Sequence, residues 1–368
     1  MILRLASALV VALPIVACST AKANPCDNLA KLPRANTSIT SARVVAPGTF
    51  RLPPGGPRSS VEFFTAFDRL PAFCRLQATL TPSRDSHIDV EVWLPMSGWN
   101  GRYLGVGNGG FAGSISYFRL GEAVNSGYVG AATDAGHKGS ARDSRWANGH
   151  PEKQTDFDYR AVHEMTLLAK AAIEAFYGKA PDHSYFSSCS NGGRQGLMEA
   201  ERYPADYDGV MSGAPAMHFG FRTFPSDKID AFRDRGGKLI IYHGGSDAPQ
   251  NSIDYIRQLQ ARMGRDTVNG FMQLYIVPGM GHCGSGDVPN DFGQWVRPNA
   301  DPDRSMLKAL ERWVETGVRP RSVIATQWVK DGDTASGVLR TRPLCPYPQL
   351  ALRTSRGDPN DAKSYECR

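Results

Sequence analysis

The sequence lacks the features that usually identify nucleic-acid-binding, metal-binding and membrane-spanning proteins. Its 42 Lys and Arg and 36 Asp and Glu residues are scattered, without a block of like charge or a basic stripe with interleaved aromatics. The net charge of +6 therefore predicts no nucleic-acid partner. There is no C-x-x-C and no histidine pair at ligand spacing, so no zinc or other cofactor is expected. Beyond the N-terminus no apolar run is long enough to span a bilayer.

The first 23 residues have the composition of an export signal. Arg4 precedes an apolar run over residues 5–17, and Ala21-Lys22-Ala23 fits a signal-peptidase site. A second interpretation is a bacterial lipobox at Ile15-Val16-Ala17-Cys18, in which Cys18 is acylated and anchors the protein to the outer membrane. Both patterns predict export, to the periplasm or the medium. Cleavage after Ala23 leaves residues 24–368 as one catalytic domain.

Cysteine usage agrees with export. Cys18 lies in the signal region, which leaves an even number of cysteines in the mature chain. An even set in an oxidising compartment predicts three disulfides. The six residues are Cys26, Cys74, Cys189, Cys283, Cys345 and Cys367.

Strand-like and helix-like segments alternate along the chain, which predicts a mostly parallel sheet with helices on both faces. Strands are expected over residues 88–95, 103–106, 128–132, 185–188, 209–212, 238–242 and 272–277, and helices over 160–177, 193–202, 253–263 and 306–316. The residues that follow the signal, up to about residue 57, are expected to form an irregular arm. Residues 284–300 are expected to form a surface loop.

A serine occupies the turn between the strand at 185–188 and the helix at 193–202. Ser188-Cys189-Ser190-Asn191-Gly192-Gly193 is similar to a nucleophile elbow, with Ser188 in place of the usual first glycine. Alone, such a segment is often only a turn. Its hydroxyl becomes a good nucleophile when an imidazole takes the proton and a carboxylate orients that imidazole.

The two partners follow later strands, in the chain order of α/β-hydrolases. Asp247 comes after the strand at 238–242, and His282 comes after the strand at 272–277. We predict Ser190 as nucleophile, His282 as base and Asp247 as acid. The rival histidines and carboxylates fit this order less well: His137, His163, His243, Asp208 and Asp287.

Two cysteines flank the predicted catalytic pair. Cys189 directly precedes Ser190, and Cys283 directly follows His282. If hydroxyl and imidazole are within hydrogen-bonding reach, the two cysteines are neighbours as well. A disulfide tolerates Cα separations of only about 4.4–6.8 Å, so a Cys189–Cys283 bridge would constrain the site tightly. The alternative is two unrelated structural cysteines.

Five blocks of the sequence resemble the tannase and feruloyl esterase family, which includes mono(hydroxyethyl) terephthalate hydrolases. The blocks are Gly107-Asn108-Gly109-Gly110-Phe111-Ala112-Gly113, Thr133-Asp134-Ala135-Gly136-His137, Cys189-Ser190-Asn191-Gly192-Gly193-Arg194-Gln195-Gly196, Ser212-Gly213-Ala214-Pro215-Ala216 and Pro278-Gly279-Met280-Gly281-His282-Cys283. The resemblance implies an α/β-hydrolase fold, serine esterase activity and two further disulfides, Cys26–Cys74 and Cys345–Cys367.

The chain departs from the family between Ala216 and the strand at 238–242. Typical members carry a large lid domain there, with a calcium site and much of the pocket for the aromatic acid. Here only residues 217–237 remain, and no run of carboxylates replaces the calcium site, so no metal is expected. A more open site predicts poorer discrimination among esters.

The glycine-rich loop at residues 107–113 follows the strand at 103–106. Glycines let a backbone approach a substrate and direct N–H groups at a developing oxyanion. The N–H groups of Asn191 and Gly110 are predicted to form this oxyanion hole, with Gly109 as the alternative to Gly110. The other interpretation is a flexible loop without a chemical role.

These features predict hydrolysis of a small-molecule ester of a hydroxycinnamic, gallic or similar aromatic acid through an acyl-enzyme. A generic short-chain or polyester-oligomer esterase is the first alternative. A non-catalytic binding protein on the same fold is the second.

Overall fold

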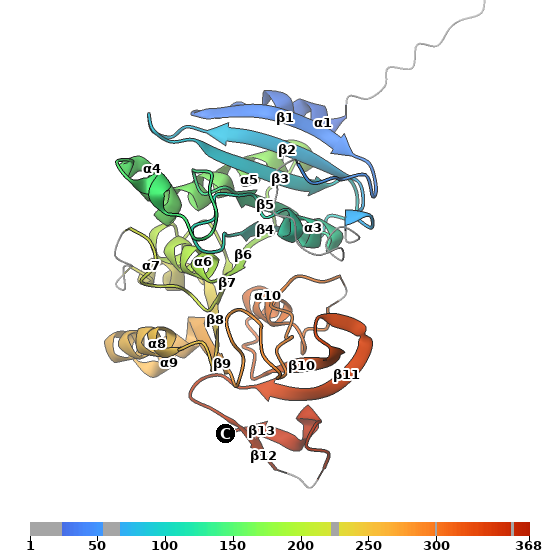
Figure 1. Cartoon of the computed structure of the whole chain (residues 1–368), viewed down its shortest axis with the longest axis vertical. Coiled ribbons are helices and arrows are strands. Elements are labelled where there is room, and N and C mark those ends of the chain that lie inside the picture. Colours follow the sequence, from blue (N-terminus) through green and yellow to red (C-terminus); the bar gives the residue numbers. More distant parts are fainter. Residues whose placement is uncertain (1–23, 54–66, 222–227, 299, 355–356) are drawn as a thin grey trace, which may run out of the picture.

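A single large sheet organises the protein. The computed structural model describes residues 24–53, 67–221, 228–298, 300–354 and 357–368 (Figure 1). The predicted signal segment, with Cys18, lies outside these ranges. Within them, a nine-stranded sheet has the order β1-β2-β3-β5-β4-β6-β7-β8-β9. The strands are β1 Thr37–Val45, β2 Phe73–Leu80, β3 Ile88–Pro95, β4 Arg102–Val106, β5 Val129–Thr133, β6 His183–Cys189, β7 Gly209–Gly213, β8 Lys238–Gly244 and β9 Met272–Val277.

The sheet is mostly parallel, as the sequence predicts. Strands β5, β4, β6, β7, β8 and β9 run parallel to one another, whereas β1, β2 and β3 form an antiparallel extension that joins β5. All five residues of β5 are buried, as expected for a parallel strand covered on both faces. Because β6, β8 and β9 point the same way, the turns that follow them meet at one edge of the sheet.

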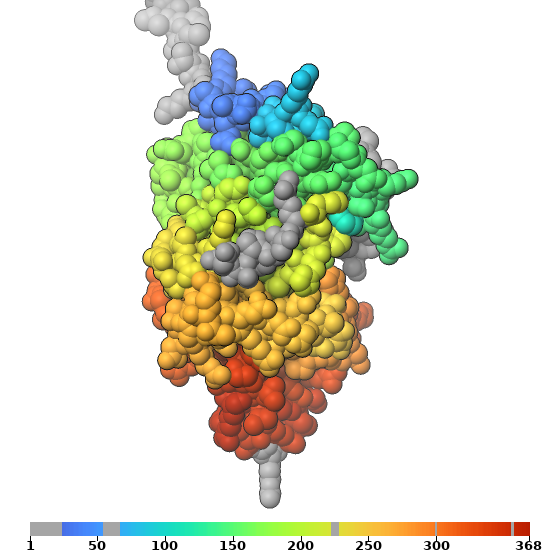
Figure 2. Space-filling view, turned by 90° about the vertical axis from the view of Figure 1, so that its left-hand side faces the viewer, coloured from blue at the N-terminus to red at the C-terminus, as the bar shows by residue number. Residues whose placement is uncertain are grey.

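Helices cover both faces of the sheet (Figure 1). Buried apolar residues of α5 (Ala161–Tyr177), α6 (Asn191–Arg202) and α8 (Gln250–Met263) contribute to one core cluster, and those of α3 (Tyr117–Asn125) and α10 (Met306–Thr316) contribute to another. This arrangement is the α/β-hydrolase fold. In the space-filling view the chain forms successive bands from its N-terminal to its C-terminal end (Figure 2). No helix of the described residues combines the length and apolarity needed to cross a membrane.

The four predicted helices occur, but the sequence did not predict α3, α7 (Asp230–Asp234) or α9 (Arg265–Phe271). The helix predicted from residue 160 begins as α5 at Ala161, but α4 (Pro151–Thr155) and a π-helical turn, η3 (Asp156–Arg160), lead directly into it. The helix ends at Gly178, whose φ of 74° gives a left-handed cap. Residues 284–298 and 300 contain no helix or strand, as expected, although Asn290, Phe292 and Gln294 are buried.

The prediction of an irregular N-terminal arm is wrong. Thr37–Val45 forms β1, which pairs with β2 along its length. This segment is rich in β-branched residues, which suit a strand, but the surrounding Pro, Ser and Arg residues obscured the pattern. The short helix α1 (Pro25–Asn28) precedes it, and the Cys26–Cys74 disulfide ties α1 to β2. Residues 54–57 of the predicted arm lie outside the described residues.

The C-terminal region contains strands that the sequence did not predict. β10 (Val323–Lys330) and β11 (Asp333–Leu344) form an antiparallel pair, and β12 (Ala351–Arg353) pairs with β13 (Tyr365–Cys367). The Cys345–Cys367 disulfide joins the end of β11 to β13. The residues that connect β11 to β12 also run beside β9, where Tyr347 N–H donates to Leu274 O.

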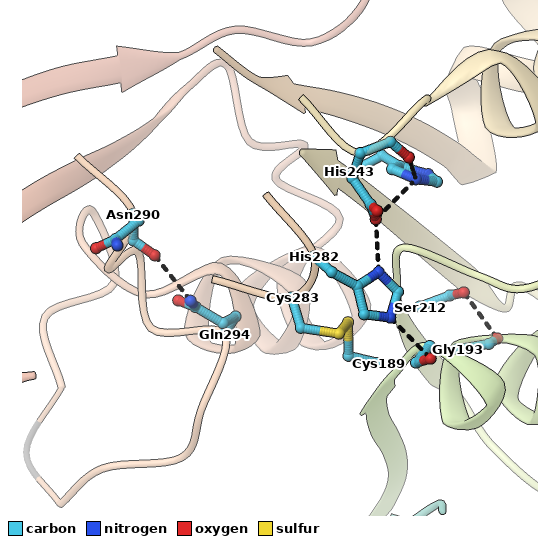
Figure 3. Close-up of a disulfide and its surroundings, with 10 residues drawn as sticks. Cys189, Gly193, Ser212, His243, His282, Cys283, Asn290 and Gln294 are labelled. Atoms are coloured by element: carbon cyan, nitrogen blue, oxygen red, sulfur yellow. Dashed lines mark hydrogen bonds and ion pairs between the residues drawn. A yellow bond between two sulfur atoms is a disulfide. The ribbon is translucent and has the colours of Figure 1, made fainter. Parts of the chain in front are cut away.

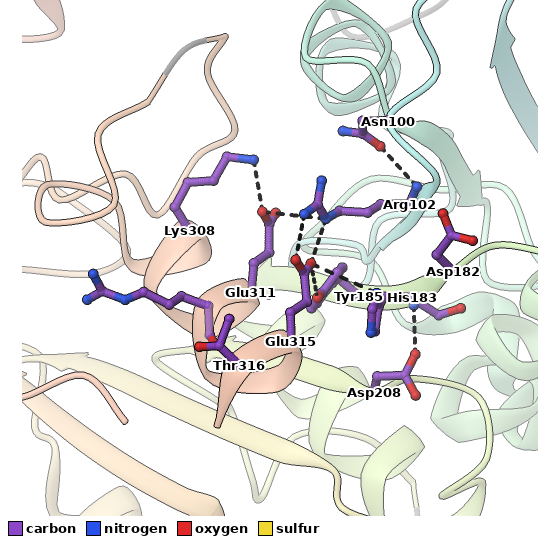
Figure 4. Close-up of polar contacts among 12 residues, drawn as sticks. Asn100, Arg102, Asp182, His183, Tyr185, Asp208, Lys308, Glu311, Glu315 and Thr316 are labelled. Carbon is purple, nitrogen blue, oxygen red and sulfur yellow. Dashed lines mark hydrogen bonds and ion pairs between the residues drawn. The ribbon is translucent and has the colours of Figure 1, made fainter. Parts of the chain in front are cut away.

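Ion pairs tie α10 to the beginning of the central strands (Figure 4). Arg102, the first residue of β4, donates from Nε to Glu315 Oε1 at 2.7 Å. Tyr185 of β6 donates to the same oxygen at 2.8 Å. Burial, together with the neighbouring carboxylates of Glu315 and Glu311, raises the pKa of the Tyr185 phenol. This network lies at the opposite end of the strands from the turns that follow β6, β8 and β9.

Candidate active site

The predicted nucleophile occupies a strained turn. Ser190 separates β6 from α6. Its backbone has φ 66° and ψ −127°, a conformation that residues other than glycine rarely adopt. Its N–H donates to Gly213 O at 2.9 Å, which fixes the turn on the neighbouring strand β7. A Cβ at position 192 would lie 2.0 Å from Ser188 Oγ, so only glycine fits there. The turn therefore explains why small residues surround Ser190.

The structure brings the three predicted catalytic side chains into one hydrogen-bonded row. Ser190 Oγ lies 2.8 Å from His282 Nε2, and His282 Nδ1 lies 2.6 Å from Asp247 Oδ2 (Figure 3). An ionised carboxylate only accepts hydrogen bonds, so Nδ1 carries the hydrogen and Nε2 accepts from the serine hydroxyl. The His282 side chain is 51% exposed and that of Asp247 24%. This geometry permits proton transfer from serine to imidazole.

Backbone hydrogen bonds hold the turn of Asp247 against the turn of His282. Gly245 N–H donates to Val277 O at 2.8 Å, and Ser246 N–H donates to Met280 O at 3.0 Å. The two turns follow the neighbouring parallel strands β8 and β9. The relative position of acid and base thus depends on backbone contacts as well as on their side chains.

A disulfide joins the turn of Ser190 to the loop of His282 (Figure 3). Cys189 and Cys283 are bonded, with their Cα atoms 5.9 Å apart. Cys283 has φ 63°, so the chain turns sharply directly after His282. The bridge therefore holds the Ser190 and His282 backbones in the register that the hydrogen bond requires.

The glycine-rich loop after β4 lies against the N-terminus of α6. Asn191 is the first residue of α6, so its N–H has no acceptor within the helix. Gln195 of the same helix accepts from Asn108 N–H at 3.0 Å, and its Nε2 donates to Asn108 Oδ1 at 3.3 Å. These two bonds pin the loop beside the nucleophile.

The two glycines considered for the oxyanion hole differ in their surroundings. Gly110 has φ 52°, and a Cβ there would lie 2.5 Å from Ala141 O, so no other residue fits. A Cβ at Gly109 would meet nothing within 4 Å. His137 supports this loop by donating from Nε2 to Phe111 O at 2.8 Å, and burial lowers the pKa of His137, which favours the neutral ring.

Comparison with known proteins decides the family. The model of the family described as tannase and feruloyl esterase matches residues 74–229 and 221–368. The chain belongs to the tannase and feruloyl esterase family. It is 27% identical to an uncharacterized esterase of Xanthomonas campestris over an alignment of 532 residues that covers 93% of this chain and 91% of the relative. It is 26% identical to a probable feruloyl esterase of Arthroderma benhamiae, over 80% of this chain and 85% of the relative.

Two solved structures share the fold of this chain. An esterase from Aspergillus oryzae has a TM-score of 0.82 at 21% identity. The structural alignment covers 94% of this chain and 99% of the chain of that esterase. Tannin acyl hydrolase from Aspergillus niger has a TM-score of 0.70 at 17% identity, with 94% and 95% covered. This member of the tannase and feruloyl esterase family is a carboxylic ester hydrolase with an α/β-hydrolase fold.

The rival candidates in this esterase have other partners. Asp287 has a side chain 94% exposed and accepts from Gln327 Nε2 at 2.5 Å. Asp208 accepts from Ser184 N–H at 2.8 Å at the beginning of β6, away from the triad edge. His163 pairs with Asp206 at 2.6 Å. Of the histidines considered as alternatives to His282, only His243 lies beside Asp247.

One group of described side chains in this esterase has the composition of a metal site. Ligand atoms of His163, Glu199 and Asp206 lie within 4.8 Å of one another. Burial and the neighbouring Asp206 carboxylate raise the pKa of Glu199 well above its usual value. This shift favours the neutral form of Glu199. The group lies on α5, α6 and the segment after α6.

Sequence reasoning gave no role to several residues that support the site. Gln195, Arg194 and His243 all touch a predicted catalytic or oxyanion element through their side chains. Gln195 and Arg194 stand within the block that contains Ser190, which was the available signal for them. His243 lies near the end of β8, at the same sheet edge as Asp247.

Proposed function

We propose that this esterase cleaves esters of aromatic carboxylic acids through an acyl-enzyme formed on Ser190. The hydrogen-bonded row from Ser190 through His282 to Asp247 carries the proposal. Serine attacks the ester carbonyl while His282 takes its proton, and Asp247 stabilises the resulting imidazolium. His282 then returns the proton to the departing alcohol.

Deacylation repeats these steps with water as nucleophile. His282 takes a proton from water, the hydroxide attacks the acyl carbon, and the Ser190 oxygen leaves with the proton from His282. In both halves a negative charge develops on the carbonyl oxygen. The N–H groups of Asn191 and Gly110 are proposed to stabilise that charge, with Gly109 as the alternative donor.

A cluster of aromatic rings beside the site supports an aromatic acyl group. Phe111 follows Gly110, and its ring centroid lies 4.2 Å from that of Phe219. Phe219 stands three residues after Ala216, whose N–H donates to Ser190 O at 3.2 Å. Aromatic rings attract one another in stacked and edge-to-face arrangements, so a hydroxycinnamoyl or galloyl ring is a suitable ligand here.

The generic short-chain or polyester-oligomer esterase is the second candidate, because the site is open. His282 is half exposed, and the two matches to the family model meet at residues 221–229, where the shortened lid is expected. We propose that residues 24–368 form one domain in which residues 217–237 replace the lid. A shallow site would favour small or flexible acyl groups.

Steady-state kinetics separate the two candidates. We expect kcat/KM for methyl ferulate or methyl gallate to exceed that for ethyl acetate and ethyl butyrate by at least tenfold. The reverse order would replace the aromatic-acid proposal with the short-chain one.

The Ser190→Ala variant tests the proposed nucleophile. It should lose at least about 10³-fold in kcat on every ester and should no longer react with a fluorophosphonate. Full activity of this variant would overturn the catalytic assignment.

We also propose that the protein is exported, with cleavage after Ala23 as the first candidate and acylation of Cys18 as the second. The disulfides among the described cysteines support an oxidising compartment. The intact mass of the mature protein from its native host distinguishes an Asn24 N-terminus from a lipidated Cys18. A mass that includes residues 1–17 would contradict both.

A further inference from the structure

Two imidazoles share one oxygen of the proposed catalytic acid. Asp247 Oδ2 lies 2.6 Å from His282 Nδ1 and 3.3 Å from His243 Nε2. The two histidines approach from different strands: His243 lies in β8, and His282 lies after β9. Figure 3 draws both contacts as dashed lines on the same carboxylate.

The neighbours of His243 determine which nitrogen carries its hydrogen. Nε2 faces the backbone carbonyl of Asp247 at 3.1 Å as well as Oδ2, and both oxygens only accept hydrogen bonds. Nε2 must therefore carry the hydrogen. Nδ1 lies 2.8 Å from Ser252 Oγ of α8, and the hydroxyl can donate to it. All hydrogen-bonding positions of a neutral His243 are thus satisfied.

The environment keeps His243 neutral. Its side chain is 6% exposed, and burial lowers its pKa, although Asp247 opposes this effect. The charged or titratable groups that face it are Asp247 on the turn after β8 and His282 after β9, and His282 further lowers the pKa of His243. Ser252 faces it from α8 and carries no charge.

We propose that His243 is a positioning residue for the ester hydrolysis, and that its Nε2–H holds Asp247 in place and shares the negative charge of the carboxylate. The inference rests on the proposed role of Asp247. Nε2–H donates to the Asp247 backbone carbonyl, which fixes the residue, and it also lies 3.3 Å from Oδ2. A carboxylate with this second polarised N–H beside it stabilises the His282 imidazolium less strongly. His243 therefore orients the acid and reduces the negative charge that Asp247 presents to the His282 imidazolium.

A matched pair of amide variants tests the donor. The amide group introduced by His243→Gln can reach the position of imidazole Nε2, whereas the shorter side chain introduced by His243→Asn reaches only that of Nδ1. For His243→Asn we expect the acid limb of the kcat/KM profile to move up by roughly 0.5 pH unit, because the Asp247 carboxylate loses the polarised N–H that lies 3.3 Å from Oδ2. His243→Gln should retain the wild-type limb. A wild-type limb in both variants would overturn the inference.

Two further measurements separate this role from a structural one. In the background of Asp247→Asn, His243→Asn should shift the limb no further, because a residue that acts through Asp247 has nothing left to act on. His150→Asn is the matched control, since His150 pairs with Asp85 on the surface at 3.0 Å, and it should leave the profile unchanged. An equal shift with and without the Asp247 carboxylate would overturn the inference.

Nitrogen-15 NMR of the wild-type imidazoles needs no substitution and covers the case in which His243→Asn does not fold. The hydrogen should reside on Nε2 of His243 from pH 5 to pH 8. Residence on Nδ1 would rule out donation to Asp247. The proposed triad is tested separately, because an active Asp247→Ala variant would contradict the triad, whereas an inactive one combined with an Nδ1–H tautomer would contradict only the role of His243.

Discussion

Arg194 and Asn191 are joined within the first turn of α6, where Arg194 Nε donates to Asn191 Oδ1 at 2.8 Å. The guanidinium also donates to the carbonyls of Asp158 and Phe157, at 3.1 and 3.3 Å, in the π-helical turn before α5. Arg194 therefore connects the helix of the nucleophile to the neighbouring helix from a fully buried position.

Replacing Arg194 by leucine should reduce both stability and turnover. The buried Asp158 carboxylate would lose the guanidinium 3.5 Å away, and breaking a buried pair costs about 3–5 kcal/mol. Asn191 would lose a side-chain partner next to its proposed oxyanion N–H, so we expect kcat to fall more than KM rises. Urea unfolding and steady-state kinetics on one aromatic ester measure the two effects.

Arg202→Leu is the matched control, because Arg202 lies on the same helix and stacks on Tyr159 at 4.3 Å without touching the catalytic turn. It should lower the free energy of unfolding by about 1 kcal/mol at most and leave kcat unchanged. Equal kinetic effects of the two substitutions would contradict a specific role for Arg194.

Removing the Cys189–Cys283 bridge should reduce turnover, whereas removing Cys345–Cys367 should not. The first closes 94 residues of chain and the second 22. Loop entropy alone predicts losses of about 4–5 and about 3 kcal/mol in the free energy of unfolding. Of these two bridges, only the first connects the backbones beside Ser190 and His282. Unaltered kcat in the Cys189→Ala/Cys283→Ala protein, measured below its melting temperature, would show that the bridge serves stability alone.

Gln195→Leu should slow turnover about 10- to 100-fold with little change in KM. The leucine has a similar volume, but it leaves the Asn108 N–H without its acceptor and releases the loop that carries Gly110. Affinity for an arylboronic acid, which forms a tetrahedral adduct on the serine, should fall in parallel. Gln195→Glu keeps the acceptor and should retain most of the activity. A slow Glu variant would indicate that the donation to Asn108 Oδ1 matters instead.

The convergence of the proposed triad could be predicted because the placement of its residues follows a rule of topology. Central strands such as β5 and β8 are short, apolar and buried on both faces, so the sequence indicates where each ends. Residues directly after neighbouring parallel strands must meet at one edge. Ser190, Asp247 and His282 satisfy that condition in the chain order of the fold.

The supporting residues could not be predicted in the same way. Gln195 and Arg194 are ordinary polar residues of a helix until packing shows that both are buried and which loops they reach. The edge strand β1 has a partly exposed surface and no continuous apolar run, so its pairing with β2 is visible only in three dimensions. Long-range partners of this kind depend on the tertiary arrangement rather than on local periodicity.

A buried carboxylate should give the protein a distinctive stability profile between pH 4 and pH 6. Asp134, directly after β5, accepts from the N–H groups of Asp89 and Gly136 at 2.9 and 3.0 Å and from Lys138 Nζ at 2.7 Å. Burial outweighs these bonds and raises the pKa of Asp134 to about 6. Over this interval the folded protein therefore holds a proton that the unfolded chain, with its ordinary carboxyl pKa, has released.

The contribution of Asp134 to stability is thus present at low pH and is lost as pH rises through about 6. The full change corresponds to on the order of 3 kcal/mol, because each pKa unit is worth about 1.4 kcal/mol. Asp134→Asn cannot titrate, so its free energy of unfolding should improve relative to wild type by that order between pH 4 and pH 7. Asp89 gives the opposite sign: hydrogen bonds from Lys138 and Thr79 lower its pKa, so its contribution is lost as pH falls. Urea unfolding checks both signs, between pH 4 and pH 7 for Asp134→Asn and below about pH 4 for Asp89→Asn. Parallel curves for wild type and Asp134→Asn would mean that Asp134 titrates normally.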